Sequence, residues 1–271
     1  MATALPDEVL RATRAYLGAA DALLPGGITE LAAAGSLALG AYRPGASDID
    51  LIAVIDDGWR GRSSLMPRLR ALHLAQVPRL VGRATRGLGF SACCNVSFVW
   101  RGELTLPVSR IAPIASHVGE IFDAAGAFDV NPVMWRELAD FGIAVRGREP
   151  AAWELDAEPH TLGNWTRANL ADYWYPLMRR LERRRAPLSA ARVGWCLLGP
   201  ARMHATLTTG RIVSKRDGAR HAIEAFPAHA PILRLALARL DREPLPAAPP
   251  ANEWRDRTVA CMRDIIGVAL G

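Results

Sequence analysis

The stretch Gly35-Ser36, followed eleven positions later by Ser47-Asp48-Ile49-Asp50-Leu51, decides the fold of this chain. An apolar segment over residues 28–34 precedes the Gly-Ser pair, and a second apolar run follows the two aspartates. Both runs have the length and composition of buried β-strands. Residues two apart in a strand point to the same face of the sheet, so the side chains of Asp48 and Asp50 are expected to lie close together.

Two carboxylates held that close repel each other unless a cation lies between them. Hard oxygen ligands beside a small Gly-Ser turn suit Mg²⁺ that carries a nucleoside triphosphate. Gly35 lets the backbone approach a phosphate, Ser36 supplies a hydroxyl and an amide donor, and Ser47 is a second hydroxyl candidate. The alternative is a solvated acidic turn, but the apolar strands on both sides favour a metal-nucleotide site.

This pattern, a Gly-Ser pair, a spacer and an Asp-x-Asp on a strand, resembles the nucleotidyltransferase superfamily headed by DNA polymerase beta. The resemblance implies that Asp48 and Asp50 bind Mg²⁺ and are catalytic, while Gly35 and Ser36 bind the triphosphate of ATP. It also implies the reaction, in which a hydroxyl of an acceptor attacks the α-phosphate and pyrophosphate leaves.

Within that superfamily the chain is most similar to the aminoglycoside (3″)(9) adenylyltransferases. Ala201-Arg202 and the run Thr209-Gly210-Arg211-Ile212-Val213-Ser214-Lys215 resemble a segment of their C-terminal domain, and residues 141–147 resemble the end of their N-terminal domain. The likeness implies that Arg202 and Lys215 contact the phosphates. Lys215 is the only lysine in an arginine-rich chain, which is typical of a place that needs a compact point charge.

The segment pattern predicts an α+β protein, with a mixed-sheet nucleotidyltransferase domain at residues 1–147, a linker at 148–163 and an all-α helical bundle at 164–271. The active site is expected in the cleft between the two domains. In the first domain the apolar spacing predicts helices over 6–23, 36–40, 65–81 (broken at Pro78) and 131–141, and strands over 28–34, 49–55 and 90–100. In the second, it predicts helices over 165–184, 189–208, 215–225, 230–240 and 252–270.

Composition limits the class of protein. The 271 residues carry a net charge of +6 with a pI near 9.7, and no apolar run approaches the length of a membrane span. The N-terminus has acidic residues where a signal peptide would be basic. The four cysteines lack metal-ligand spacing, so buried free thiols are expected. A cytoplasmic monomer follows as the expectation.

One position departs from the family pattern. Family members carry an acid on the strand after the second helix, and aligning 95–99 with that strand places Asn95 there. An asparagine binds metals weakly and orients a hydroxyl, but it does not accept a proton at neutral pH. Glu103 has the right parity but lies roughly 26 Å further along a continuous strand. Three interpretations stay open: another acid serves, the acceptor needs little base assistance, or turnover is degraded while nucleotide binding persists.

The acceptor side also departs from the pattern. Enzymes that bind polycationic aminoglycosides line the cleft with acids and a stacking aromatic residue, whereas this chain carries arginines at 179, 180, 183–185 and 192. If these face the cleft they repel a polycation, and the alternative is a solvated helix face. The nearby aromatics Trp165, Tyr173, Trp174 and Trp195 are either core residues or stacking partners of a sugar or base. His160 and His204 are bases by residue type, although a lone histidine is more often structural.

The leading hypothesis is an ATP- and Mg²⁺-dependent nucleotidyltransferase that adenylylates a hydroxyl of a small acceptor, in the manner of an aminoglycoside adenylyltransferase. The alternative is a nucleotide-binding pseudoenzyme or regulatory protein that keeps the ATP pocket without the base. A nucleic-acid-binding role depends only on the basic charge, and the sequence lacks interleaved basic and aromatic motifs, so nucleic acid is not the expected partner.

Overall fold

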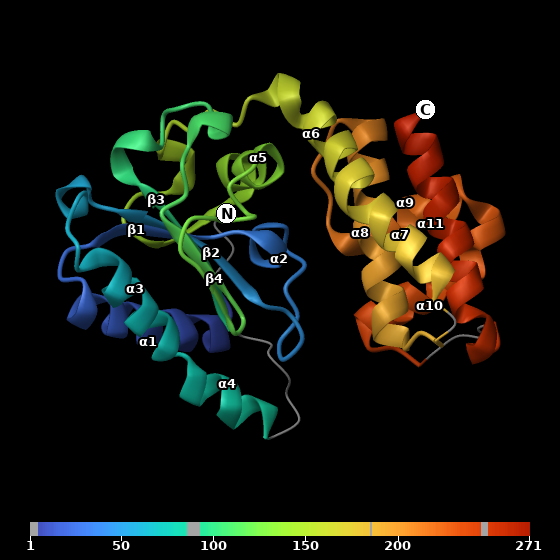
Figure 1. Cartoon of the computed structure of the whole chain (residues 1–271), viewed down its shortest axis with the longest axis horizontal. Coiled ribbons are helices and arrows are strands. Elements are labelled where there is room, and N and C mark those ends of the chain that lie inside the picture. The colour runs from blue at the N-terminus through green and yellow to red at the C-terminus, as the bar shows by residue number, and fades with distance from the viewer. Residues whose placement is uncertain (1–4, 86–92, 185, 245–248) are drawn as a thin grey trace. The chain divides into compact units, whose positions relative to one another are not determined.

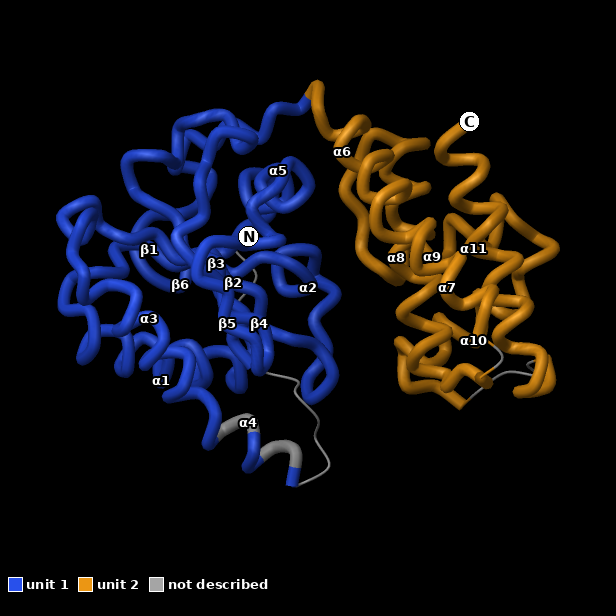
Figure 2. Tube along the Cα trace, viewed as in Figure 1, with its two compact units in different colours: residues 1–159 blue, residues 160–271 orange. Residues whose placement is uncertain are grey.

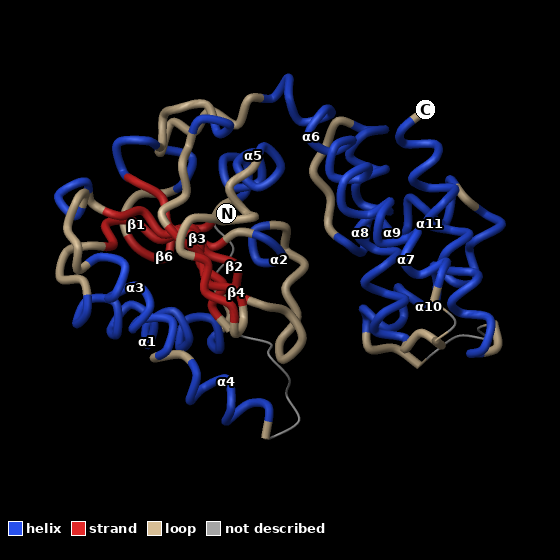
Figure 3. The backbone as a smooth tube through the Cα atoms, viewed as in Figure 1, coloured by secondary structure: helices blue, strands red, loops and turns tan. Residues whose placement is uncertain are grey.

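The computed structural model describes residues 5–85, 93–184, 186–244 and 249–271. The chain forms two compact units, Met1–Pro159 and His160–Gly271, which are coloured separately in Figure 2. Among the described residues, all strands belong to the first unit and the second unit is helical (Figure 3), so the predicted α+β order is confirmed. Trp153 and Ala157, within the stretch predicted as a linker, are buried in the core of the first unit. The predicted domain boundaries stay a prediction.

The first unit is built on a six-stranded mixed sheet with the order β5-β4-β3-β2-β1-β6. Its central pair β2 and β3 is parallel, and every other neighbouring pair is antiparallel. The strands are β1 (Ile28–Ala33), β2 (Ile49–Ile55), β3 (Cys94–Trp100), β4 (Ala115–Val118), β5 (Ile121–Asp123) and β6 (Ile143–Arg146). The sequence did not predict β4, β5 or β6, because segments of three or four residues are too short to show a period of two.

The two faces of the sheet enter separate cores because successive side chains of a strand alternate. Leu31, Leu51 and Phe98 pack with α1 (Asp7–Leu23) and α3 (Leu65–Leu74) on one face. Ala32 and Ile52 pack with α5 (Pro132–Phe141) and Trp153 on the other. Figure 1 shows α1 and α3 on one side of the sheet and α5 on the other. The short helix α2 (Gly35–Ala38) follows β1 directly.

The predicted helix 65–81 is two helices. α3 ends at Leu74 and α4 (Val77–Ala84) begins three residues later, with Pro78 in its first turn. Proline is tolerated there because the first turn of a helix has no intrahelical acceptor for its missing N–H. The break therefore precedes Pro78. Of the predicted strand 90–100, β3 covers 94–100, and residues 90–92 lie outside the described residues.

The second unit surrounds the helix α8 (Ala190–Thr209), which contacts α9, α10 and α11. Its helices are α6 (Leu162–Asn169), a π-helical segment Leu170–Trp174, α7 (Tyr175–Arg183), α8, α9 (Lys215–Ala225), α10 (Ala230–Asp241) and α11 (Trp254–Leu270). The side chain of Trp174 lies on Gly199 of α8, where a β-carbon would come within 2.1 Å of the indole ring. Only glycine fits at that position of α8.

Across the described parts of the chain, no helix combines the length and the apolar character that crossing a membrane requires.

Candidate active site

The Gly35-Ser36 turn lies directly against Asp50. Gly35 has a φ of +62°, and a β-carbon there would lie 2.3 Å from Asp50 Oδ2. The N–H of Ala34 donates a hydrogen bond to the carbonyl oxygen of Asp50 at 2.9 Å, which ties the end of β1 to β2. Glycine is therefore favoured at position 35 for two reasons: the backbone is left-handed, and Asp50 occupies the space of a β-carbon. The Gly35-Ser36 pair and the Asp-x-Asp segment of the sequence motif are thus in contact through Gly35 and Asp50.

The carboxylates of the motif lie at the start of β2. Asp50 is the second residue of that strand and is half-buried, and Asp48 immediately precedes the strand and is exposed. The hydroxyl of Ser47 accepts a hydrogen bond from the Arg43 N–H at 3.1 Å, so Ser47 helps to close the preceding turn. Ser36, at the start of α2, is half-buried.

Asn95 lies beside Asp50. The parallel register of β2 and β3 places the two residues opposite each other, and Asn95 Nδ2 donates a hydrogen bond to Asp50 Oδ1 at 3.1 Å. Asn95 Oδ1 accepts the N–H of Gly119 at 3.0 Å, and the side chain is 6% exposed. Asn95 is thus held at both ends of its amide, next to a proposed metal ligand.

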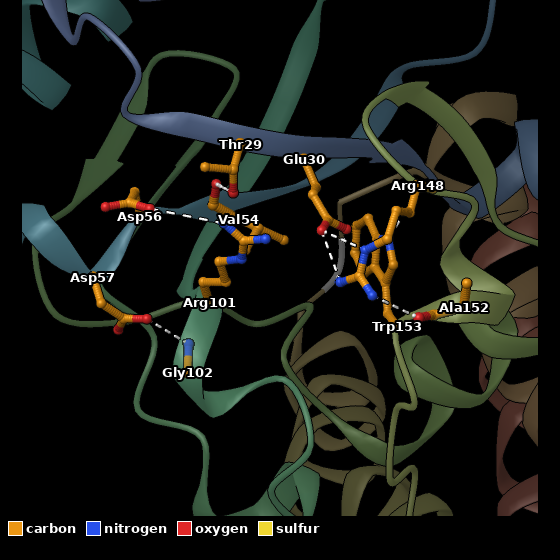
Figure 4. A network of polar contacts seen from close by, with 10 residues as sticks. All are labelled: Thr29, Glu30, Val54, Asp56, Asp57, Arg101, Gly102, Arg148, Ala152 and Trp153. Atoms are coloured by element: carbon orange, nitrogen blue, oxygen red, sulfur yellow. Dashed lines mark hydrogen bonds and ion pairs between the residues drawn. The ribbon is translucent and has the colours of Figure 1, made fainter.

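Glu103 does not belong to this site. It follows the opposite end of β3, in a short 3-10 helix over Arg101–Glu103, where its carboxylate accepts a hydrogen bond from Arg60 at 2.9 Å. Figure 4 shows polar contacts at that end of the two strands, including the Gly102 N–H donating to Asp57 at 2.8 Å. The strand β3 carries the chain away from Asn95 as far as Trp100. Glu103 therefore does not come back to Asn95, although the two residues would share a face of a continuous strand.

A residue that sequence reasoning missed contacts the turn. Glu137 of α5 is 2% exposed, and its Oε1 accepts a hydrogen bond from the N–H of Gly35. The sequence contained a signal for it, because Glu137 lies three residues after Met134 and four before Phe141, on the apolar stripe of the predicted helix. An acid on such a stripe marks a polar contact inside the fold.

These donors suit the binding of Mg²⁺ with a nucleotide. Mg²⁺ commonly uses one or two protein carboxylates, several waters and substrate phosphates. Asp50 supplies a carboxylate against the turn, and Asp48, two residues earlier in the chain, supplies an exposed second one. The residues present therefore fit a metal that the phosphates of a substrate help to hold.

In the second unit, the segments that carry Arg202 and Lys215 pack against each other. Arg202 lies in α8, Lys215 is the first residue of α9, and a β-carbon on Gly218 would lie 2.5 Å from Arg202 Cα. The hydroxyl of Ser214 accepts the Asp217 N–H at 3.1 Å and caps α9. Two cations thirteen residues apart in sequence thus belong to one packed pair of helices.

The side chain of His204 is held by contacts with other side chains of the second unit. Its Nδ1 lies 3.0 Å from His221 Nε2, and its ring packs edge-on against Phe226 with centroids 4.9 Å apart. Burial, and then the neighbouring His221, lower the pKa of His204. His160 lies in a short 3-10 helix, Pro159–Thr161, and is exposed.

The arginine-rich segment is partly engaged within the second unit. Glu182 accepts hydrogen bonds from both Arg179 and Arg263, while Arg192 is exposed and Arg185 lies outside the described residues. Of the aromatic residues, Trp174 is buried and Tyr173 and Trp195 are about half exposed. The centroids of the Trp174 and Trp195 rings are 5.9 Å apart. Tyr173 and Trp195 therefore expose part of their aromatic rings.

Comparison with known proteins agrees with this architecture. Residues 166–244 match the family model described as the aminoglycoside adenylyltransferase C-terminal domain. Over these residues the match agrees with the resemblance predicted from the sequence. The fold is similar to that of spectinomycin adenyltransferase AAD(9) from Enterococcus faecialis, a crystal structure with ATP and spectinomycin, at a TM-score of 0.63 and 13% identity over 96% of this chain and 98% of that one. A comparison with curated protein sequences finds no match.

Proposed function

We propose that this protein is an ATP- and Mg²⁺-dependent nucleotidyltransferase that adenylylates a hydroxyl of a small acceptor. The observation that carries the proposal is the close approach of Gly35 to Asp50 of β2, with Asp48 immediately before that strand. The match of residues 166–244 to the adenylyltransferase C-terminal domain supports the same reaction. Burial of all four cysteines as free thiols is consistent with the proposed cytoplasmic location, and a monomer is proposed as the working state.

The mechanism assigns each residue a physical task. Asp48 and Asp50 would hold Mg²⁺, which neutralises phosphate charge when it is bound. Gly35 and Ser36 would hold the triphosphate, with Ser47 in support, and Arg202 and Lys215 would neutralise the phosphates. The acceptor oxygen forms a bond to the α-phosphorus as the bond to pyrophosphate breaks. Most of the catalysis is then positioning and charge stabilisation.

Asn95 has a role in this scheme that does not need a proton. Its amide donates to one oxygen of Asp50, which orients that carboxylate, and it accepts the backbone N–H of Gly119. The hydroxyl proton of the acceptor then passes to water or to a phosphate oxygen. A reaction of this kind is slower than one with a positioned base, since such a base typically contributes 10²–10⁴-fold.

The same observation favours the second candidate, a nucleotide-binding pseudoenzyme. A chain that keeps the metal ligands and the turn but has an amide beside Asp50 is suited to bind ATP without transferring it. In this case the protein is a regulatory one, whose conformation responds to the nucleotide.

The acceptor is proposed to be a small molecule with a hydroxyl, and aminoglycosides are the class to test first. The similar structure of AAD(9) contains spectinomycin. Arg192 is exposed in the segment where aminoglycoside-binding relatives were expected to present acids. Acceptors without a high positive charge therefore belong in the same panel.

Mass spectrometry of an acceptor panel incubated with the protein, ATP and Mg²⁺ tests the proposal. We expect the addition of one AMP to at least one member and its loss in Asp50→Asn, while Asp140→Asn, a surface change in α5, retains it. An unmodified panel, together with ATP binding that Asp50→Asn abolishes, supports the pseudoenzyme. In that case, a gain of transfer by Asn95→Glu would identify a lapsed catalytic site.

A further inference from the structure

Two acidic side chains are buried among the described residues, Glu30 at 3% and Glu137 at 2% exposure. Burying a carboxylate is costly unless it is paired or hydrogen-bonded. Glu30 is paired, because its Oε1 accepts two hydrogen bonds from the Arg148 guanidinium at 2.9 and 2.8 Å (Figure 4). Glu137 directs its Oε1 at the backbone N–H of Gly35. A buried carboxylate therefore reaches across 102 residues of sequence to the turn proposed to bind phosphate.

The helix that carries Glu137 is firmly fixed. Asn131 caps α5, with its Oδ1 accepting the Met134 N–H at 3.0 Å, and Pro132 occupies the first turn. Trp135 and Leu138 on either side of Glu137 are fully buried in the core beneath the sheet. The packing of α5 thus fixes the backbone that carries Glu137.

Gly35 is held from two directions. The carboxylate of Asp50 occupies the space where a β-carbon would be, and Glu137 accepts the amide proton. Gly35 has a left-handed backbone and is the first residue of the four-residue helix α2, so these two contacts hold the start of that helix. Hydrogen bonds to a charged acceptor are about twice as strong as neutral ones. The contact therefore selects one conformation of the Gly35-Ser36 turn.

We propose that Glu137 is a positioning residue for nucleotide binding, holding the Gly35-Ser36 turn in the conformation that presents Ser36 to the triphosphate. This inference depends on the proposed function of that turn. The amide of Gly35 is committed to Glu137, so the hydroxyl and amide of Ser36 provide the contact to phosphate. The role needs an acceptor oxygen at position 137 and does not need a group that takes a proton.

Measured affinity for Mg²⁺-ATP tests this inference in the full chain. Glu137→Ala removes the acceptor, and we expect roughly 10- to 100-fold weaker binding, the loss typical of a hydrogen bond to a charged group. Glu137→Gln keeps a carbonyl oxygen on the same stem, and we expect binding within about threefold of wild type. Asp140→Asn, one turn further along α5, is the matched control with unchanged affinity. If Glu137→Ala binds as tightly as wild type, or if Glu137→Gln loses affinity as fully as alanine, the positioning role is overturned.

The amide exchange rate of Gly35, measured by NMR without nucleotide, gives a second and independent readout. We expect a protected amide in wild type and in Glu137→Gln, and rapid exchange in a folded Glu137→Ala. Equal protection in all three would overturn the inference. Wild-type protein that fails to bind ATP overturns the proposed function itself, whereas ATP binding retained in Glu137→Ala overturns only the role of Glu137. Glu137→Gln that binds ATP normally but loses all AMP transfer would show a proton-accepting role and overturn the positioning role.

Discussion

Asn95 shows how a single amide changes the electrostatics of the site. Its Nδ2 is a donor to Asp50 at 3.1 Å, where a carboxylate would add a second negative charge. The amide lets the two strands pair without a cation between them. A carboxylate at the same position would repel Asp50 and make the unfolding free energy depend on bound metal.

Asn95→Asp tests this dependence. We expect the variant to lose about 1–3 kcal/mol of unfolding free energy in chelator, because a hydrogen bond is replaced by repulsion, and to regain much of it with millimolar Mg²⁺. Chemical unfolding with and without Mg²⁺ measures both. The matched control is Asn131→Asp, which loses the 2.7 Å bond to the Phe128 carbonyl oxygen away from the metal ligands. The unfolding free energy of this control should fall equally with and without Mg²⁺. If the stability of Asn95→Asp is also unaffected by Mg²⁺, that result would contradict a metal site at Asp50.

A second residue with a measurable consequence is His117 of β4, which is 1% exposed. Its Nε2 accepts a hydrogen bond from Gln76 at 3.1 Å, and its ring lies 5.5 Å from His73 and 5.6 Å from Tyr16. Burial, and then repulsion by His73, lower the pKa of His117 to about 3. The native state therefore holds this imidazole neutral at a pH where the unfolded chain would protonate it.

The sign of the pH dependence follows from that shift. Below pH 6.5 the imidazole of His117 is protonated in the unfolded chain, whereas in the native state it stays neutral down to about pH 3. The contribution of His117 to the unfolding free energy is therefore complete above pH 7 and falls as the pH decreases. We expect His117 to lower the unfolding free energy by about 2 kcal/mol between about pH 7.5 and about pH 5. Urea unfolding at the two pH values measures it. His117→Phe should remove this component, while His160→Gln, at an exposed position, should keep it, and equal pH slopes in all three proteins would contradict the assignment.

At the scale of the element, the pair α8 and α9 depends on one glycine. Gly218 allows the first turns of α9 to lie against the backbone of Arg202, whose Cα, Cβ and N would be 2.5, 2.7 and 2.8 Å from an added β-carbon. Because two of those atoms are backbone, rotation of a side chain does not relieve the clash. The helices must separate, and the segments of Arg202 and Lys215 must move apart with them.

Gly218→Ala and Gly194→Ala are therefore expected to have opposite effects. The first should destabilise the second unit by about 1–3 kcal/mol through overpacking and weaken ATP binding. The second, in α8, places a β-carbon 3.9 Å from Leu198 in ordinary contact, and should stabilise by up to about 1 kcal/mol through helix propensity. Unfolding free energies and ATP affinities of both variants check this. A Gly218→Ala protein with wild-type stability would show that the packing of α8 on α9 is looser than the structure has it.

At the scale of the whole molecule, the net charge is +6, and several of the arginines form ion pairs inside one unit. Arg146 forms two hydrogen bonds with Asp21 at 2.6 Å, Arg148 binds Glu30, and Arg216 binds Asp241 at 2.7 Å. These arginines stabilise tertiary contacts, and a basic composition of this kind need not indicate a surface for nucleic acid. The expectation that nucleic acid is not the partner stays a prediction.

The sequence by itself determined the α+β order, the Gly35-Ser36 turn, the Asp48 and Asp50 pair and the helical second half. Each of these depends on local periodicity or on a short motif, which neighbouring residues specify. Only the tertiary structure showed the hydrogen bonds of Asn95 to Asp50 and of Glu103 to Arg60, and directed Glu137 of α5 to Gly35. Strand register and helix packing set those contacts between residues far apart in sequence, and no local pattern encodes such a distance.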